Sequence, residues 1–216
     1  SRKLRQLANE NLIYFQEEAS QFTAHSIDLA VGEKFVDVCA SPGSKATYIN
    51  AFKNPGAVIV AGDFYKHRIK SLAANVESQG ANRIQVVQYD AENSLPFADR
   101  SFDIVLIDAP CTGTGTIRRN PEIRYSLKEE DFGVLASKQL NILKNASKLL
   151  KTGGKMIYST CSIESEENED VIEGFLESSE GFSIIPPNVS EKFLTERGFA
   201  RTYPHRDALD GFFIAT

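Results

Sequence analysis

Short apolar runs alternate along this chain with longer segments in which apolar residues recur every three or four positions. Five runs have the composition of buried strands: residues 34–40, 57–63, 84–90, 102–109 and 155–161. Intervening segments such as 67–79 and 131–150 have the spacing of amphipathic helices. Strands that alternate with helices predict a parallel sheet joined by right-handed crossovers. The last run, residues 210–216, is predicted to form a closing edge strand.

The alternation starts near residue 31 and continues to the end of the chain. We therefore predict an α/β domain over residues 31–216, a length that suits one hydrophobic core. Residues 1–30 are predicted to be a lead-in segment, the remnant of a longer RNA-binding region. The chain begins with Ser1 instead of Met, which agrees with a missing upstream part.

Composition narrows the class of protein without identifying it. The net charge of −5, from 24 basic and 29 acidic residues, argues mildly against a simple nucleic-acid coat protein. Basic residues nevertheless cluster locally, where they can meet phosphates or simply face solvent: Arg2, Lys3 and Arg5; Arg118, Arg119 and Arg124; Arg197, Arg201, His205 and Arg206. The three cysteines form no CxxC pair and the three histidines are scattered, so no metal site is predicted. Without a long apolar stretch or signal peptide, we expect a cytoplasmic protein that is monomeric and contacts no membrane.

Polar side chains follow several of the predicted strands. Asp63, Asp90 and Asp108 end three of them, and Cys39 and Cys161 stand at similar positions in two others. In open α/β sheets, ligands bind at the edge where the carboxyl ends of the parallel strands meet. The acids and the two cysteines therefore predict a site at that edge.

Residues 37–45, DVCASPGSK, link the first strand to its helix. Their small side chains let backbone N–H groups approach a ligand at a helix start, where the dipole favours negative charge. The segment is neither GxGxxG nor a P-loop, which disfavours a dinucleotide or a triphosphate. Asp63 is placed to accept from ribose hydroxyls and Asp90 from an adenine amino group, so an adenosine ligand fits. A tight turn without any ligand is the alternative interpretation.

The segment 102–125 carries a second candidate centre. Its strand delivers Asp108, Pro110 and Cys111, and a loop rich in Gly and Thr leads on to Arg118 and Arg119. Pro110 would fix the turn that brings the Cys111 thiol to the sheet edge, and the arginines could clamp phosphates. A small buried cysteine before a flexible loop is the alternative.

Cys161 follows the fifth strand and precedes a helix rich in acids, and alone it could equally be an inert core residue. Two cysteines beside an adenosine pocket suggest methyl transfer to a pyrimidine. Cytosine C5 is a poor nucleophile until a thiolate adds to C6, which turns C5 into an enamine carbon. Asp108 could stabilise that adduct, and the base must leave its stack to be reached. Spacing alone does not decide which cysteine attacks.

Five motifs together resemble the Nop/Sun family of RNA cytosine-5 methyltransferases, nearest the bacterial 16S rRNA members of the Sun/RsmB type. The motifs are QEEASQ, DVCASPGSK, DAPCTGTGTIRRNPEIRY, YSTCSIESEEN and DGFFIA. The resemblance runs from about Asn11 to the last residue. It implies a Rossmann-like class I S-adenosylmethionine-dependent methyltransferase fold, with a mostly parallel seven-stranded sheet and an antiparallel edge strand.

The resemblance also implies roles for particular residues. Cys161 would be the nucleophile and Cys111 would assist release of the methylated RNA, whereas in DNA cytosine-5 methyltransferases the cysteine after the proline attacks. Independently of the resemblance, Arg118, Arg119 and Arg124 are predicted to bind RNA through their positive charge. S-adenosylmethionine would be held by Cys39, Ala40, Ser41, Pro42, Gly43, Ser44, Lys45, Asp63, Arg68, Asp90 and Asp108.

The chain departs from the family pattern in the cofactor loop, where CAAPGGK is usual. Ser41 replaces an alanine and Ser44 a glycine; if position 44 needs a positive φ, the added Cβ would weaken cofactor binding. Ribosomal RNA is the first substrate hypothesis. The alternatives are methylation of tRNA or DNA cytosine, and an RNA-binding ribosome-assembly factor of weak catalytic activity.

Overall fold

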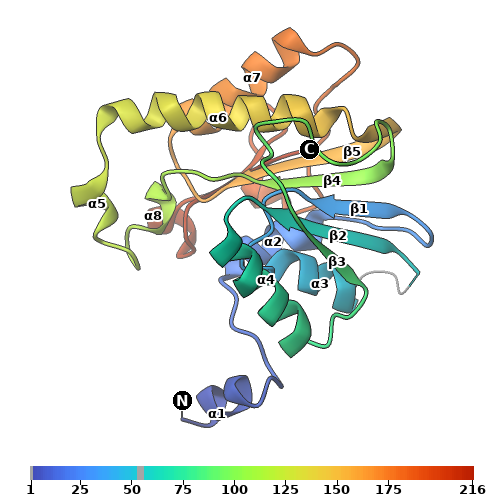
Figure 1. Ribbon diagram of the computed structural model, residues 1–216. Coiled ribbons are helices and arrows are strands. Elements are labelled where there is room, and N and C mark those ends of the chain that lie inside the picture. The colour runs from blue at the N-terminus through green and yellow to red at the C-terminus, as the bar shows by residue number, and fades with distance from the viewer. Residues whose placement is uncertain (1, 53–55) are drawn as a thin grey trace.

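The computed structural model describes residues 2–52 and 56–216, which contain a seven-stranded sheet between two layers of helices (Figure 1). The strand order is β3-β2-β1-β4-β5-β7-β6. The strands are β1 (Lys34–Asp37), β2 (Val58–Asp63), β3 (Ile84–Gln88), β4 (Phe102–Asp108), β5 (Leu150–Thr160), β6 (Ala200–Thr202) and β7 (Phe212–Ala215). The five predicted strands are all present, and β1 to β5 pair in parallel as expected.

The reversed strand has a different position from the one predicted. β7 is antiparallel to β5, as the sequence suggested, but β6 pairs with its other side and forms the edge of the sheet. The prediction that residues 210–216 close the edge is therefore wrong. β6 escaped prediction because it has only three residues, and its central residue is a buried arginine, Arg201.

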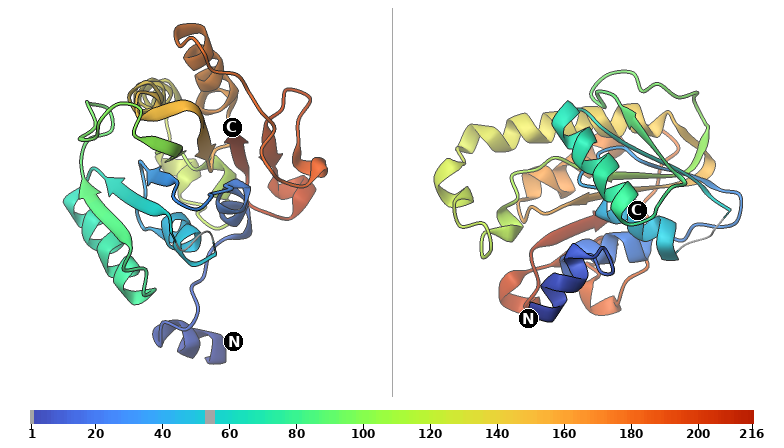
Figure 2. Two further views of the ribbon diagram at one scale, coloured as in Figure 1. Left: turned by 90° about the vertical axis from the view of Figure 1, so that its right-hand side faces the viewer. Right: turned by 60° about the horizontal axis from the view of Figure 1, so that its bottom comes forward.

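Helices cover both faces of the sheet (Figures 1 and 2). They are α1 (Arg2–Asn9), α2 (Glu18–Ser26), α3 (Ser44–Phe52), α4 (Lys66–Ser78), α5 (Ile123–Ser126), α6 (Glu129–Ser147), α7 (Glu169–Ser178) and α8 (Pro204–Asp207), with 3-10 turns η1 (Thr114–Thr116), η2 (Ser165–Glu167) and η3 (Glu191–Phe193). α2, α3 and α4 lie on one face, and α6 and α7 on the other, whereas α1 stands apart from the body. No helix in the described part of the chain is long and apolar enough to cross a membrane.

Alternate residues of the central strands supply two separate apolar cores. In β1, Phe35 packs with the α2–α4 layer and Val36 with the α6–α7 layer. In β4, Leu106 and Ile107 divide in the same way. Successive side chains of a strand point to opposite faces, so a sheet covered on both faces needs continuous apolar runs. These runs are what made the strands recognisable in the sequence.

β5 is longer than the sequence predicted. It begins at Leu150, which pairs with Phe102, and its register against β4 shifts before Lys155 pairs with Ile104. Gly153, with φ +78°, lies in this irregular stretch. Glycines weaken a strand pattern and often mark such bulges, so only the regular second half, from residue 155, was predicted.

Candidate active site

The predicted site residues gather around two hollows at the carboxyl ends of the parallel strands. A cavity of about 50 Å³ is lined by Cys39, Asp63, Arg68 and Asp90 together with neighbouring side chains. A more open cavity of about 290 Å³ is lined by Ala40, Ser41, Pro42, Ser44, Lys45, Asp108, Arg119 and Cys161, among others. Nearly all of the predicted cofactor residues, and the predicted nucleophile, are thus brought to one edge.

The loop between β1 and α3 has the tight backbone that its small residues suggested. Gly43 has φ +106°, and a Cβ atom there would lie 2.7 Å from Cδ1 of Leu72. Ser44 is the first residue of α3 and does not have a positive φ, so its Cβ causes no backbone strain. The predicted reason for weak cofactor binding at Ser44 is therefore wrong, because within residues 39–45 it is Gly43 that has the positive φ.

Ser41 is tied to the end of β2. Its N–H donates to Oδ2 of Asp63 at 3.2 Å, and its hydroxyl donates to the carbonyl of Arg68 at 3.1 Å. The Arg68 guanidinium in turn donates to the Ser41 carbonyl at 3.1 Å and lies 3.2 Å from Asp63. Asp63, Arg68 and Ser41 therefore form one hydrogen-bonded unit that shapes the smaller cavity.

The smaller cavity has the donor and acceptor set that an adenosine group requires. Asp63 and Asp90 bring carboxyl oxygens to its lining, and the aromatic side chains of Phe64 and Tyr65 complete it. Each carboxyl is already oriented by backbone, since Phe64 N–H donates to Asp63 at 2.8 Å and Glu92 N–H to Asp90 at 3.0 Å. Ribose hydroxyls and an adenine amino group are donors that such fixed acceptors can bind.

A fourth acid, Asp37, lies within the DVCASPGSK motif, and the sequence predicts no role for it. It ends β1 and is fully buried, and neither of its carboxyl oxygens has a hydrogen-bond partner of good geometry among the described residues. Burial, and then repulsion by Asp108, raises the pKa of Asp37 to about 8. Only its place at a strand end signalled it, because the sequence could not show that its carboxyl is orphaned.

Lys45 and Asp108 form an ion pair at the floor of the larger cavity. Lys45 Nζ lies 2.6 Å from Oδ2 of Asp108, and the Ser159 hydroxyl donates to the other oxygen at 2.8 Å. Burial, the largest single effect, disfavours the charged form of Lys45, but attraction and hydrogen bonding to Asp108, together with Asp37 and Cys161, outweigh it and raise the pKa of the lysine. The pair thus places a cation and a carboxyl group beside Cys161, which lines the same cavity.

The two candidate cysteines face each other. Sγ of Cys111 lies 3.4 Å from Sγ of Cys161. The contact with Cys111, together with the Lys45 cation, lowers the pKa of Cys161 despite burial, whereas the contact with Cys161, burial and the Glu167 carboxylate raise the pKa of Cys111. The arrangement therefore favours a thiolate at Cys161 and a thiol at Cys111. Burial also raises the pKa of Cys39, which leaves that thiol protonated and unreactive.

Three distant motifs meet in the backbone around Cys161. The N–H of Gly115 donates to the Cys161 carbonyl at 2.9 Å, and the N–H of Gly211 donates to the Gly115 carbonyl at 2.8 Å. A Cβ atom at Gly115 would collide with Gly211 and with the Cys161 carbonyl. The Gly-rich loop after Cys111 is therefore a packed element that joins both cysteines to the terminal strand.

The arginines predicted to bind RNA have unequal surroundings. Arg118 Nε lies 2.8 Å from Asp210, and Arg119 also pairs with this carboxyl, which is completely buried. Arg124, on α5, is exposed. Two of the three arginines thus hold the terminal segment in place, although both remain about half exposed.

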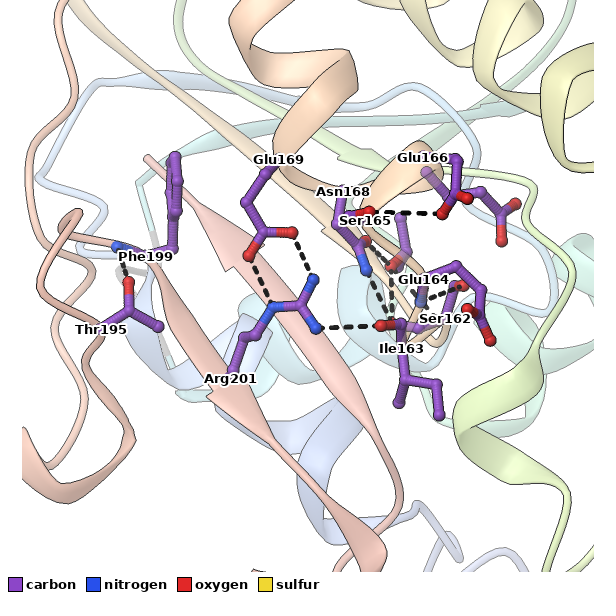
Figure 3. Close-up of polar contacts among 12 residues, drawn as sticks. Ser162, Ile163, Glu164, Ser165, Glu166, Asn168, Glu169, Thr195, Phe199 and Arg201 are labelled. Carbon is purple, nitrogen blue, oxygen red and sulfur yellow. Dashed lines mark hydrogen bonds and ion pairs between the residues drawn. The ribbon is translucent and has the colours of Figure 1, made fainter.

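One residue of the C-terminal basic cluster cannot form part of an exposed basic surface. Arg201 is buried, pairs with Glu169 and donates to the Ile163 carbonyl at 3.0 Å, as Figure 3 shows. The expectation that Arg201 meets phosphates or faces solvent is therefore wrong, because its guanidinium is bound to partners inside the protein. Sequence reasoning also missed Asp210 and Glu167, buried acids whose partners lie far away in the chain.

Fold and site together define a class of protein. The mostly parallel seven-stranded sheet with one reversed strand, and its acid-lined hollow at the carboxyl edge, is the fold of class I S-adenosylmethionine-dependent methyltransferases. A family model described as 16S rRNA methyltransferase RsmB/F matches residues 24–216. The chain therefore belongs to the RsmB/F family, which confirms the resemblance seen in the motifs.

Individual relatives agree with this assignment. The chain is 36% identical to the probable ribosomal RNA small subunit methyltransferase B of Bacillus subtilis, over 94% of this chain and 47% of the relative. It is 34% identical to the ribosomal RNA small subunit methyltransferase F of Vibrio vulnificus, over 94% and 45%. The solved structure of NSun6 from Pyrococcus horikoshii with SFG superimposes with a TM-score of 0.86 at 28% identity, over 97% of this chain and 53% of that one. The chain thus spans about half the length of the curated relatives that it matches.

Proposed function

We propose that this chain is the catalytic part of an S-adenosylmethionine-dependent RNA cytosine-5 methyltransferase, with ribosomal RNA as substrate and Cys161 as covalent nucleophile. The observation that carries the proposal is the facing pair of sulfurs, 3.4 Å apart, with Cys161 lining the same cavity as the ion pair of Lys45 and Asp108. Two relatives are named as ribosomal RNA small subunit methyltransferases B and F, which supports ribosomal RNA as the substrate.

The cofactor site fits S-adenosylmethionine. Asp63 and Asp90 offer acceptors for ribose and adenine donors in the smaller cavity, beside the tight loop at Gly43. The orphaned carboxyl of Asp37 adds a buried acid next to Lys45 and Asp108. When bound, the cofactor supplies a methyl group on a sulfonium as electrophile. The relative NSun6 was solved with SFG, an analogue of S-adenosylmethionine, which supports this choice of cofactor.

The residues of the larger cavity match the demands of covalent catalysis. The Cys161 thiolate forms a bond to cytosine C6, and the C5–C6 π pair moves to C5, which then takes the methyl group. Asp108, held by Lys45 and Ser159, would accept a hydrogen bond from the exocyclic amino group of the base. Loss of the C5 proton to solvent returns its electron pair to the ring, restores the double bond and expels the thiolate.

Cys111 has the protonation state that release requires. Its raised pKa keeps it a thiol, which can donate a hydrogen bond to the sulfur of Cys161 as the C6–S bond breaks. A donor at the leaving atom lowers the barrier to its departure. The DNA-enzyme pattern, with attack by the cysteine after the proline, is disfavoured because Cys161 lines the larger cavity with Lys45 and Asp108, whereas Cys111 lies behind it and is not part of that lining.

The mouth of the larger cavity suits a single-stranded nucleic acid. Tyr14 and Phe15 line it with exposed rings, and Phe15 is 59% exposed. Arg119 lines the same mouth and is half exposed. Exposed aromatic rings beside a cation are the usual means of stacking bases and tracking a backbone.

A methyl-transfer assay with labelled S-adenosylmethionine tests the proposal. The substrates are unmodified small-subunit ribosomal RNA, tRNA and DNA, each digested afterwards to nucleosides for chromatography. We expect label in 5-methylcytidine from ribosomal RNA and none after Cys161→Ala. Label only in tRNA or DNA would reassign the substrate, and label at another position of cytosine would refute the covalent mechanism. Cofactor binding without transfer to any substrate would favour the non-catalytic assembly factor.

A further inference from the structure

Two adjacent residues, Glu167 and Asn168, lie between the loops that carry the cysteines. Both are completely buried, at the junction of η2 and α7. Both carboxyl oxygens of Glu167 have hydrogen-bond partners, and so do the amide oxygen and nitrogen of Asn168. A buried polar group destabilises the fold unless it is hydrogen-bonded, and apolar residues could anchor a helix here without that free-energy penalty. The presence of two buried polar side chains therefore indicates that their directional hydrogen bonds have a role.

Glu167 holds the loop of Cys111 from both sides of that cysteine. Its Oε1 accepts from the Thr112 N–H at 2.9 Å, and its Oε2 accepts from the Thr112 hydroxyl at 2.5 Å. The Gln139 amide bridges to the other side, since it donates to Glu167 at 3.0 Å and to the Pro110 carbonyl at 2.9 Å. The backbone before and after Cys111 is thus fixed relative to a single carboxyl group.

Asn168 does the same for Cys161. Its amide nitrogen donates to the Ser162 carbonyl at 3.0 Å, and its oxygen accepts from the Thr160 hydroxyl at 2.5 Å (Figure 3 shows Asn168 beside Ser162). The Ser162 N–H closes the loop by donating to Oγ1 of Thr160 at 3.2 Å. Both chain neighbours of Cys161 therefore depend on one amide side chain.

The pair is itself anchored from the sheet. The Tyr158 hydroxyl, on β5, donates to the Glu167 carbonyl at 2.6 Å. On the other side, Arg201 of β6 pairs with Glu169 and donates to the Ile163 carbonyl (Figure 3). Residues 167 and 168 consequently cannot shift without moving a strand.

We propose that Glu167 and Asn168 are positioning residues that set the distance between the two cysteine sulfurs and so preserve the hydrogen-bonding contact between Cys111 and Cys161. One peptide bond links the two arms, so the two loops, fifty residues apart in sequence, are held in a common frame. The consequence for catalysis rests on the proposed function, whereas the geometric role does not.

The test follows iodoacetamide alkylation of Cys161 against pH, resolved by peptide mass spectrometry, in the full chain without RNA or cofactor. The variants are Glu167→Ala, which removes the Cys111 arm, and Asn168→Asp, which keeps the shape but replaces the donor to Ser162 with an acceptor. Glu167→Gln keeps an acceptor for the Thr112 N–H and serves as conservative rescue. Glu166→Ala is the matched control, because Glu166 is exposed and its carboxylate accepts a hydrogen bond from the adjacent Ser165 hydroxyl.

We expect the alkylation midpoint of Cys161 to move to higher pH in Glu167→Ala and Asn168→Asp, to return towards wild type in Glu167→Gln, and to be unchanged in Glu166→Ala. In a Cys111→Ala background, Glu167→Ala should add no further shift, because the donor that it positions is gone. In the methyl-transfer assay, kcat should fall roughly 100-fold with cofactor affinity unchanged, as expected for misplaced reacting groups.

Wild-type midpoints in folded Glu167→Ala and Asn168→Asp would overturn the proposal, and so would an equal shift in Glu166→Ala. Cooperative urea unfolding establishes that each variant is folded; if Glu167→Ala is not, the near-isosteric Asn168→Asp decides. A wild-type chain that methylates no RNA would refute the proposed function but leave the alkylation result, and hence the positioning role, to be judged separately.

Discussion

Sγ of Cys111 lies 3.4 Å from Sγ of Cys161, although fifty positions separate the two residues in the chain. The contact divides the two thiols into different chemical states. It lowers the pKa of Cys161 and raises that of Cys111, and two charged neighbours act in the same directions, the Lys45 cation on Cys161 and the Glu167 carboxylate on Cys111. The surroundings thus favour a thiolate at Cys161 and a thiol at Cys111, the states that the proposed nucleophile and proton donor require.

Cys111→Ala should raise the pKa of Cys161, because the thiolate loses the hydrogen bond that stabilises it most. The pH profile of Cys161 alkylation would then shift to higher pH, so that less thiolate is present at neutral pH. Cys111→Ser keeps a donor and should lie closer to the wild type. A Cys111→Ala profile that is unchanged or shifted to lower pH would contradict this account of the pair.

Asp63→Ala should weaken binding of S-adenosylmethionine by about 1–3 kcal/mol, through loss of hydrogen bonds to the ribose. The effect should include some loosening of the loop, because Asp63 also accepts from the Ser41 N–H and pairs with Arg68. Calorimetric titration measures the dissociation constant. Asp99→Ala, which removes an exposed carboxyl that does not line the smaller cavity, is the control. Equal affinities of the two variants for S-adenosylmethionine would show that Asp63 does not contribute to cofactor binding.

Arg118→Ala and Arg124→Ala should have opposite consequences. Arg118→Ala leaves the buried Asp210 with one partner fewer and should lower the free energy of unfolding by roughly 1 kcal/mol, a figure discounted because the guanidinium is partly exposed. Arg124→Ala should change stability by less than about 0.5 kcal/mol and weaken RNA binding instead. Urea unfolding and RNA titration separate the effects. A stable Arg118→Ala with lost RNA affinity would reverse the roles.

Asp37 should make the stability of the cofactor-free protein fall as pH rises from about 4 to about 8. Its folded pKa is raised to about 8, so the native state keeps a proton over this window that the unfolded state releases. Asp37→Asn removes this contribution, and its stability advantage over the wild type in urea should grow with pH. Lys45, Asp108, Asp63 and Cys39 surround the group and remain in both proteins. A constant difference between pH 4 and 8 would disprove a raised pKa.

The sequence predicted those features that leave a local pattern. Strands such as β4 were recognisable because both faces are buried, and Cys111 and Cys161 because they follow strands whose ends meet. β6 was missed because a buried arginine, Arg201, interrupts its apolar pattern. The roles of Glu167 and Asp210 could not be predicted, since a charged residue reveals neither its burial nor a partner 55 or 92 positions away.

The backbone at Ser44 shows a second limit of the sequence. A glycine-to-serine replacement suggested strain, but strain depends on φ, and only the fold reveals that Gly43 takes the positive value while Ser44 starts a helix. Motif comparison thus pointed to a tight loop, which the structure has at Gly43, but could not assign conformations within it.

The central claim, covalent catalysis by Cys161 with release through Cys111, is tested most directly by trapping the intermediate. Cys111→Ala protein is incubated with S-adenosylmethionine and unmodified small-subunit ribosomal RNA, then run on a denaturing gel beside the Cys111→Ala, Cys161→Ala double variant. The account predicts a slow protein–RNA adduct in the single variant and none in the double variant. An adduct that persists in the double variant, without Cys161, would contradict the account. So would the absence of any adduct from the Cys111→Ala protein, provided that this protein binds cofactor and that the wild type forms 5-methylcytidine in the same RNA.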